Sequence, residues 1–293
     1  MFIDAHTHAQ FAAFDKDWKE VIDRALAARV WMINVGTQKD TSRRAIEVAR
    51  NFPQGVYASI GLHPIHTEKS YHDKEELGVS TGPGGGVEQE FKSRGEEFDY
   101  DYYRKLASDP KVLTIGECGL DYYRLSGETK HRQRKAFEQQ IQLSSEVKKP
   151  LMIHCRNAIH DPAFHDLIDI LTGNSKSLVS QRPGIIHFFT GAKEDARALL
   201  DLGFRFTFGG VITFARDYDE VIRMIPSDSI LSETDAPYVT PIPYRGRRNE
   251  PANVIEVVKK LAEIRKVSLG QMEENIWANA GSFFSPQIAL PAA

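Results

Sequence analysis

Cysteine is scarce in this chain of 293 residues, which contains only Cys118 and Cys155. Two cysteines cannot form a disulfide framework, and such scarcity is typical of proteins from reducing compartments. No run of eighteen apolar residues occurs, which excludes a transmembrane helix. The N-terminus lacks the basic segment and apolar core of a signal peptide. We therefore expect a cytoplasmic protein (or a nuclear one, if the source is a eukaryote) without membrane association.

An excess of positive charge is also absent. The chain has 37 lysines and arginines against 40 aspartates and glutamates, which gives a formal net charge of −3. Bulk positive charge therefore cannot hold a nucleic acid, and a polyanionic substrate would have to be bound locally, by a metal or a basic loop. The content of 41% hydrophobic and 26% charged residues is ordinary for a globular protein.

Runs typical of buried strands alternate with helical patterns along the whole chain. We predict strands over 2–6, 30–35, 56–60, 112–116, 150–153, 184–186, 204–208 and 229–233. We predict helices over 18–28, 41–50, 98–107, 130–147, 161–171, 193–202, 219–225, 253–265 and 269–284. The seventh strand has the weakest pattern because it contains Arg205. Eight strand–helix units without a sizeable linker predict one α/β domain over 1–293, a (β/α)8 TIM-type barrel.

One polar segment, from about 68 to 97, interrupts this alternation. It contains a Gly-Pro-Gly-Gly-Gly run at 82–86. We expect a flexible insertion there, either a mobile surface loop or a lid over a site. A second polar loop is predicted over 175–183.

Potential metal ligands gather at the carboxyl ends of the predicted strands, where barrel enzymes place their active sites. These residues are His6, His8, His63, Glu117, His154, His187 and Asp235. His6 and His8 are two positions apart on one strand, so their imidazoles point the same way. Imidazole and carboxylate groups bind hard or borderline divalent cations, and one carboxylate can bridge two ions. The pattern indicates two divalent ions: Mg²⁺, Mn²⁺ or Zn²⁺.

The roles within this centre follow from its chemistry. We expect one ion on His6, His8 and Asp235, and a second ion on His154 and His187. Glu117 would bridge the two ions, which together can lower the pKa of a shared water and stabilise an oxyanion during in-line displacement. Asp235 could also orient that water or take its proton, so Asp235 and Glu117 are the catalytic candidates. His63 could contact substrate or be purely structural.

The other histidines and the cysteines are assigned ordinary structural roles. Cys118 and Cys155 each follow a proposed ligand by one position, so strand alternation turns them away and packing is expected. We treat the remaining histidines as surface residues: His66, His72, His131, His160 and His165.

An arginine-rich loop follows the eighth predicted strand and contains Arg245, Arg247 and Arg248 around Gly246. Guanidinium groups match phosphate geometry, and loops after the last strands of such barrels often bind phosphate. Arg245 is therefore a candidate phosphate contact, as is Arg156, which lies two positions after a proposed ligand. A solvated basic loop is the alternative.

Seven segments in order along nearly the whole chain resemble the TatD family of metal-dependent deoxyribonucleases, within the amidohydrolase-like barrels. They cover 2–8, 61–64, 115–122, 153–156, 187–191, 233–238 and 245–251. The blocks Glu-Cys-Gly-Leu-Asp-Tyr at 117–122 and Glu-Thr-Asp-Ala-Pro-Tyr at 233–238 are the most specific. The chain departs from the family pattern in its 68–97 insertion, its 175–183 segment and its C-terminal helix.

The resemblance implies a TIM-like barrel that hydrolyses phosphodiester bonds with a metal-activated water. It implies a 3′–5′ exonuclease acting on single-stranded DNA, and sometimes RNA, with no stable protein partner inferred. The metal positions that it implies are His6, His8, Glu117, His154, His187 and Asp235. It assigns His63, Arg156 and Arg245 to the substrate side.

Two other functions stay open. A metal-dependent deacylase or amidohydrolase, such as a D-aminoacyl-tRNA deacylase, would use the same kind of centre on a carbonyl. Such enzymes commonly use a modified lysine as the bridge, whereas Glu117 takes that place here, and the arginine loop favours phosphate. A catalytically silent barrel that binds nucleic acid is the second alternative, and the six intact ligand positions argue against it.

Overall fold

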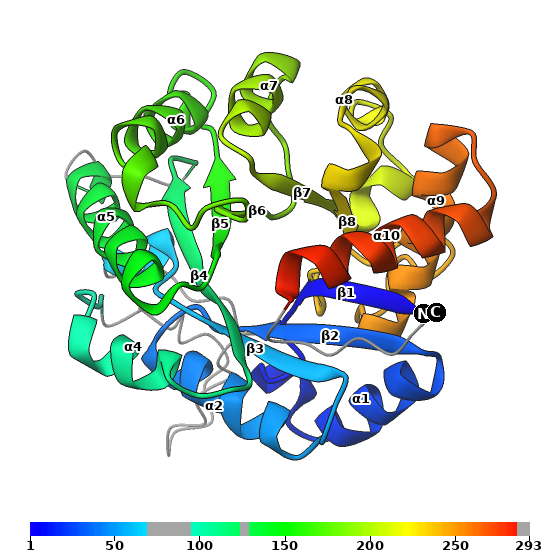
Figure 1. The fold of residues 1–293 in the computed structure, drawn as a ribbon. Helices are drawn as coiled ribbons and strands as arrows, with labels where there is room; N and C mark the ends of the chain where they lie inside the picture. The colour runs from blue at the N-terminus through cyan, green and yellow to red at the C-terminus, as the bar shows by residue number, and fades with distance from the viewer. Residues whose placement is uncertain (69–94, 124–128, 286–293) are drawn as a thin grey trace, which may run out of the picture.

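Eight parallel strands form one sheet that curls into a barrel surrounded by helices (Figure 1). The structure is a computed structural model and describes residues 1–68, 95–123 and 129–285. The strands are β1 (Phe2–Thr7), β2 (Val30–Val35), β3 (Val56–Ile60), β4 (Val112–Asp121), β5 (Leu151–Arg156), β6 (Gly184–Ile186), β7 (Arg205–Phe208) and β8 (Ile230–Ser232). They are arranged in chain order, from β1 to β8. The predicted (β/α)8 barrel is confirmed.

Contacts between the last and the first strand bring the sheet close to closure. The backbone N–H of Asp235 donates to the carbonyl of His6 at 2.9 Å, and the N–H of His8 donates to the carbonyl of Ala236 at 2.8 Å. The Ser232 hydroxyl donates to the carbonyl of Ile3 at 2.7 Å. Residues from the two ends of the chain therefore meet at the carboxyl end of the barrel.

Helices follow the strands and cover the outside of the barrel (Figure 1). They are α1 (Trp18–Ala27), α2 (Lys39–Arg50), α4 (Tyr100–Ala107), α5 (Thr129–Val147), α6 (Ala163–Gly173), α7 (Lys193–Asp201), α8 (Asp219–Met224), α9 (Val254–Arg265) and α10 (Leu269–Phe284). Each longer helix buries one apolar face; α1, for example, buries Val21, Ile22 and Ala25. Short 3₁₀ turns are η1 (Ala12–Phe14), η2 (Pro64–Thr67), η3 (Ser175–Ser177), η4 (Gly210–Thr213), η5 (Ser227–Ser229) and η6 (Pro251–Asn253).

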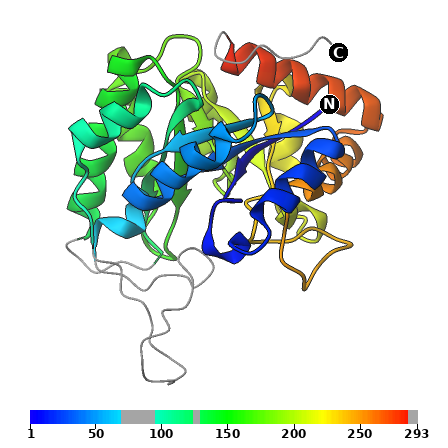
Figure 2. The same ribbon diagram turned by 90° about the horizontal axis from the view of Figure 1, so that it is seen from below.

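Helix α10 closes the amino-terminal end of the barrel (Figure 2). The Asn279 amide donates to the carbonyls of Ser227 and Ile230 at 2.7 and 2.8 Å, next to the start of β8. Arg205, the residue that weakened the pattern of the seventh strand, begins β7, where its guanidinium donates to the Asn279 carbonyl and to Ser282 Oγ. The Arg205 guanidinium therefore finds hydrogen-bond acceptors on the helix that covers this end of the barrel.

Strand β4 continues well beyond its predicted end at 116 and reaches Asp121, so that prediction was wrong. Gly116 and Gly119 have φ values of 152° and 129°, and the pairing of β4 with β5 shifts register between Ile115 and Cys118. Glycine tolerates such backbone conformations without steric cost, which lets an irregular strand continue. Glu117 consequently lies inside the strand rather than after it.

The predicted insertion falls largely outside the described residues, which leave out 69–94. The second predicted loop contains the short η3 turn. Within the described part of the chain, no helix combines the length and the apolar character that a bilayer crossing would require.

Candidate metal centre

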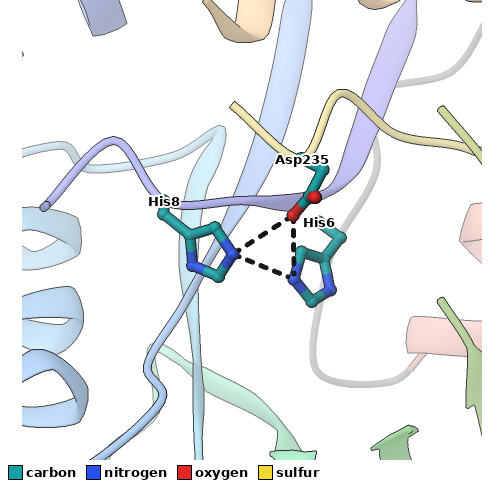
Figure 3. Close-up of side chains that lie close together, drawn as sticks. All are labelled: His6, His8 and Asp235. Carbon is teal, nitrogen blue, oxygen red and sulfur yellow. Dashed lines mark hydrogen bonds and ion pairs between the residues drawn. The ribbon is translucent and has the colours of Figure 1, made fainter. Parts of the chain in front are cut away.

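His6, His8 and Asp235 converge at the carboxyl end of the barrel (Figure 3). The two imidazole Nε2 atoms lie 3.2 Å apart. The Asp235 Oδ1 atom is 3.3 Å from Nε2 of His8 and 3.7 Å from Nε2 of His6. His6 lies in β1, His8 just after it and Asp235 just after β8. Three donor atoms that face one another at such distances form a group that can hold a cation.

A buried aspartate in β1 helps to orient this group. Asp4 is fully buried and accepts hydrogen bonds from the Thr234 backbone N–H at 2.8 Å and from its hydroxyl at 2.5 Å. Because Thr234 directly precedes Asp235, these bonds fix the segment after β8 against β1. Burial raises the pKa of Asp4 well above its ordinary value, although the bonds from Thr234 oppose this effect.

Glu117 lies between two sets of imidazoles, with one carboxylate oxygen facing each set. Its Oε2 atom is 3.5 Å from Nε2 of His6 and 3.9 Å from Nε2 of His8. Its Oε1 atom is near three ring nitrogens: His63 Nε2 at 3.2 Å, His154 Nδ1 at 3.2 Å and His187 Nε2 at 2.9 Å. The side chain is almost fully buried. This is the arrangement that a carboxylate bridging two cations requires.

The imidazoles and the carboxylate strongly affect one another's pKa values. Burial alone would raise the pKa of Glu117, but its interactions with the surrounding imidazoles outweigh burial and hold this pKa well below its usual range. Burial works against a proton on His187, yet Glu117 and Glu233 raise the pKa of His187 well above its ordinary value. A divalent cation would take the place of such protons, so the donor set fits metal binding.

His63, which the resemblance assigns to the substrate side, lies beside Glu117 and His154. It forms a possible ligand group with Glu117 and His154, and its Nδ1 accepts a hydrogen bond from the N–H of Ile65 at 3.2 Å. Burial lowers the pKa of His63 to about 4, which keeps its imidazole neutral. Because Nδ1 accepts from Ile65, the ring proton of the neutral imidazole lies on Nε2, which faces Glu117 Oε1 at 3.2 Å. Despite its proximity to the centre, His63 therefore stays a prediction for the substrate side rather than a metal ligand.

Two carboxylates that were not identified from the sequence lie beside histidines of the centre. Asp121 Oδ2 lies 3.0 Å from Nε2 of His154, while Glu233 Oε1 lies 3.6 Å from Nδ1 of His187 and is itself fully buried. Such carboxylates fix the tautomer and orientation of a ligating imidazole. Asp121 was detectable in principle, because it shares its strand face with Glu117 at a spacing of four.

The prediction that His66 lies on the surface was wrong. The η2 turn folds back toward the barrel and buries the His66 ring, whose centroid lies 5.9 Å from that of His63. His131, His160 and His165 are exposed as predicted, and His72 lies outside the described residues. Cys118 and Cys155 are buried and unpaired, in agreement with a packing role.

The arginines differ in their availability for phosphate. Arg156 ends β5 and is exposed, and Arg245 is exposed in the loop after β8. Arg248, in contrast, donates to the Asp17 carboxylate at 2.9 and 2.5 Å and to the carbonyl of Ala13 at 2.7 Å. The Asp17 carboxylate already holds the Arg248 guanidinium, so Arg156 and Arg245 remain the phosphate candidates.

Comparison with known proteins agrees with this picture. The family model described as TatD related DNase matches residues 3–285. The chain is 34% identical over 287 residues to the uncharacterized metal-dependent hydrolase YabD of Bacillus subtilis, covering 97% of this chain and 99% of that protein. It is 32% identical over 266 residues to the 3′-5′ ssDNA/RNA exonuclease TatD of Salmonella typhimurium, covering 87% of each.

Solved structures extend the comparison to the fold. The TatD homolog YJJV of Escherichia coli superposes with a TM-score of 0.78 at 25% identity, covering 99% of this chain and 98% of that one. A TatD family hydrolase of Entamoeba histolytica has the same fold, with a TM-score of 0.75 at 21% identity and coverage of 97% and 98%. The barrel and its imidazole–carboxylate cluster define a metal-dependent hydrolase. Within that class, the chain belongs to the TatD family.

Proposed function

We propose that this protein is a metal-dependent nuclease that removes nucleotides from the 3′ end of single-stranded DNA, and of RNA. The observation that carries the proposal is the position of Glu117 between two imidazole sets. Two adjacent divalent cations are the usual centre of enzymes that hydrolyse phosphodiesters by in-line displacement. The similarity to the Salmonella typhimurium protein named as an ssDNA/RNA exonuclease supports the same substrate class.

The proposed ligands divide between the two sides of Glu117. One ion would be held by His6, His8 and Asp235, and the other by His154 and His187, with Glu117 shared. Bound there, the ions would lower the pKa of a water and offset the negative charge that develops on the phosphoryl oxygens.

The chain's own residues would then orient groups and accept a proton. Burial alone would raise the pKa of Asp235, but its contact with His8 lowers the pKa below the ordinary value. Asp235 is therefore ionised at neutral pH and can accept the proton of the attacking water. Arg156 and Arg245, both exposed, would contact phosphates of the strand.

A digestion panel tests the proposal. Metal-stripped protein is assayed with Mg²⁺, Mn²⁺ or Zn²⁺ on single strands labelled at the 3′ end or at the 5′ end, and on circular single strands. We expect early release of the 3′ label as mononucleotide, a shortening ladder from 5′-labelled strands and no cleavage of circles. Cleavage of circles would contradict the exonuclease mode. Hydrolysis of a D-aminoacyl-tRNA, together with intact oligonucleotides under every ion, would replace the nuclease with a deacylase.

A further inference from the structure

The exposed apolar side chains gather around the mouth of the barrel. Among the described residues, the large hydrophobic side chains that are exposed are Tyr123, Ile159, Phe214, Ile242, Tyr244, Val267 and Leu269. The first five lie in segments that follow strands β4, β5, β7 and β8, and these segments surround the metal-binding end. Val267 lies between α9 and α10, and Leu269 begins α10, at the opposite end. Exposed aromatic rings beside a metal-binding end are available to contact a substrate.

Two of these aromatic rings each have an arginine over one face. The guanidinium carbon of Arg156 is 3.8 Å from the centroid of the Tyr123 ring, and that of Arg245 is 4.3 Å from the centroid of the Phe214 ring. Even so, Tyr123 is 50% exposed and Phe214 is 42% exposed. Each pair thus presents an accessible aromatic surface next to a cation.

Other arginine–aromatic pairs in the described part of the chain differ in this respect. Arg205 lies over the ring of Phe283 and Arg248 over that of Phe14, and both of these rings are fully buried. Those two pairs stabilise the fold. The pairs at the mouth leave their rings open to solvent, so a ligand that covers these rings would gain binding free energy from their burial.

The first pair is directly connected to the metal centre. The backbone N–H of Tyr123 donates to Oδ1 of Asp121 at 2.9 Å, and the other oxygen of Asp121 contacts His154. Arg156 is the register partner of Asp121 across β4 and β5. A molecule stacked on the Tyr123 ring would therefore lie beside His154, one of the proposed metal-binding residues.

The second pair is fixed by contacts between the loops after β7 and β8. Phe214 directly follows η4, and Thr213 Oγ1 in that turn accepts a hydrogen bond from the N–H of Ile242 at 2.9 Å. Arg245 donates to the carbonyl of Thr240 at 3.0 Å. In the barrel, β4 and β5 lie across from β8 and β1 (Figure 1), so the two pairs lie on opposite sides of the centre.

We propose that the Tyr123–Arg156 and Phe214–Arg245 pairs are two base-stacking platforms that hold unpaired nucleobases on either side of the phosphodiester being cleaved. Stacking of a base on an aromatic ring strengthens binding about tenfold or more per base, and the adjacent guanidinium can contact the neighbouring phosphate. A paired duplex cannot offer its base faces in this way, so the platforms select single strands. This inference rests on the proposed nuclease function, and it identifies the exposed base faces as the part of the substrate that the protein recognises.

The test compares a base-bearing single strand with the same strand carrying abasic tetrahydrofuran positions at its last nucleotides. KM and kcat are measured with Mn²⁺ for the parent, for a Tyr123→Leu/Phe214→Leu double variant and for a Val267→Ala control, an exposed apolar change at the far end. We expect the KM of the parent to be at least about tenfold lower for the base-bearing strand. The double variant should lose most of that preference and the control should keep it. Thermal denaturation establishes that all three proteins are folded.

Fluorescence anisotropy with the same two strands in EDTA separates this inference from the nuclease proposal. A parent that binds the base-bearing strand better than the abasic strand, but cuts neither with any ion, overturns the nuclease and keeps the platforms. Equal KM values of the parent for both strands overturn the platforms. The same holds if the folded double variant retains the parent's preference, in which case Arg156 and Arg245 contact only phosphates.

Discussion

Replacing Glu117 by glutamine is the sharpest test of the proposed centre, because the change removes one negative charge and preserves shape. The parent carboxylate places Oε1 2.9 Å from His187 Nε2 and Oε2 3.5 Å from His6 Nε2. In the Glu117→Gln variant, one of these two positions carries an NH₂ group, which cannot bind a cation. One side of the centre therefore loses its shared ligand.

The magnitude follows from losing one ion of a pair. A metal ion contributes several kcal/mol of charge stabilisation in the transition state, and about 4 kcal/mol corresponds to a factor of roughly 10³ in rate. We expect kcat/KM of Glu117→Gln on a 3′-labelled single strand to fall by about 10³ or more. The fold should persist, since without the carboxylate the neighbouring imidazoles can lose their protons at neutral pH.

Equilibrium dialysis followed by elemental analysis provides a readout that does not depend on activity. The parent and a surface control, Glu138→Gln in an exposed part of α5, should bind two Mn²⁺ ions per chain with similar affinity. Glu117→Gln should bind one ion under the same conditions. A folded Glu117→Gln protein that binds two ions and keeps kcat/KM within threefold of the parent refutes the bridging role.

Three further changes probe the shell around the centre and the barrel. Glu233→Gln removes the charge that faces His187 Nδ1, so Mn²⁺ affinity in a chelator competition should weaken about 10- to 100-fold; unchanged affinity refutes the orienting role. Burial lowers the pKa of Lys149, which donates to three backbone carbonyls, from 10.5 to about 8. Between about pH 8 and pH 10.5 the unfolded chain binds more protons than the folded chain, so the contribution of Lys149 to stability rises with pH. Lys149→Met should therefore lower Tm more at pH 9.5 than at pH 7.5. A Tm difference that does not change with pH contradicts this. Gly119→Ala would place its Cβ 2.0 Å from the His154 carbonyl oxygen in β5, at a φ of 129°. This should lower the free energy of unfolding by about 3 kcal/mol or more. The control Gly173→Ala meets no atom within 4 Å and should leave stability nearly unchanged.

The order of strands and helices could be predicted because it depends on local periodicity. Strands β2, β3 and β6 and helix α10 have the predicted bounds. The prediction failed at β4, where two glycines at positive φ carry the strand on to Asp121. A residue pattern cannot reveal that continuation, because it depends on how β4 pairs with β5.

The sequence by itself determined the barrel class and the clustering of His6, His8 and Asp235, because strand ends of a parallel barrel must meet at one end. Only the tertiary structure decided which atoms face one another: the two oxygens of Glu117 toward separate imidazole sets, Glu233 behind His187, and Arg248 held by Asp17. It also decided that Tyr123 and Phe214 remain open to solvent. The physical reason is distance along the chain. Periodicity is set by neighbours a few residues apart, whereas these contacts join residues that only the closing of the barrel brings together.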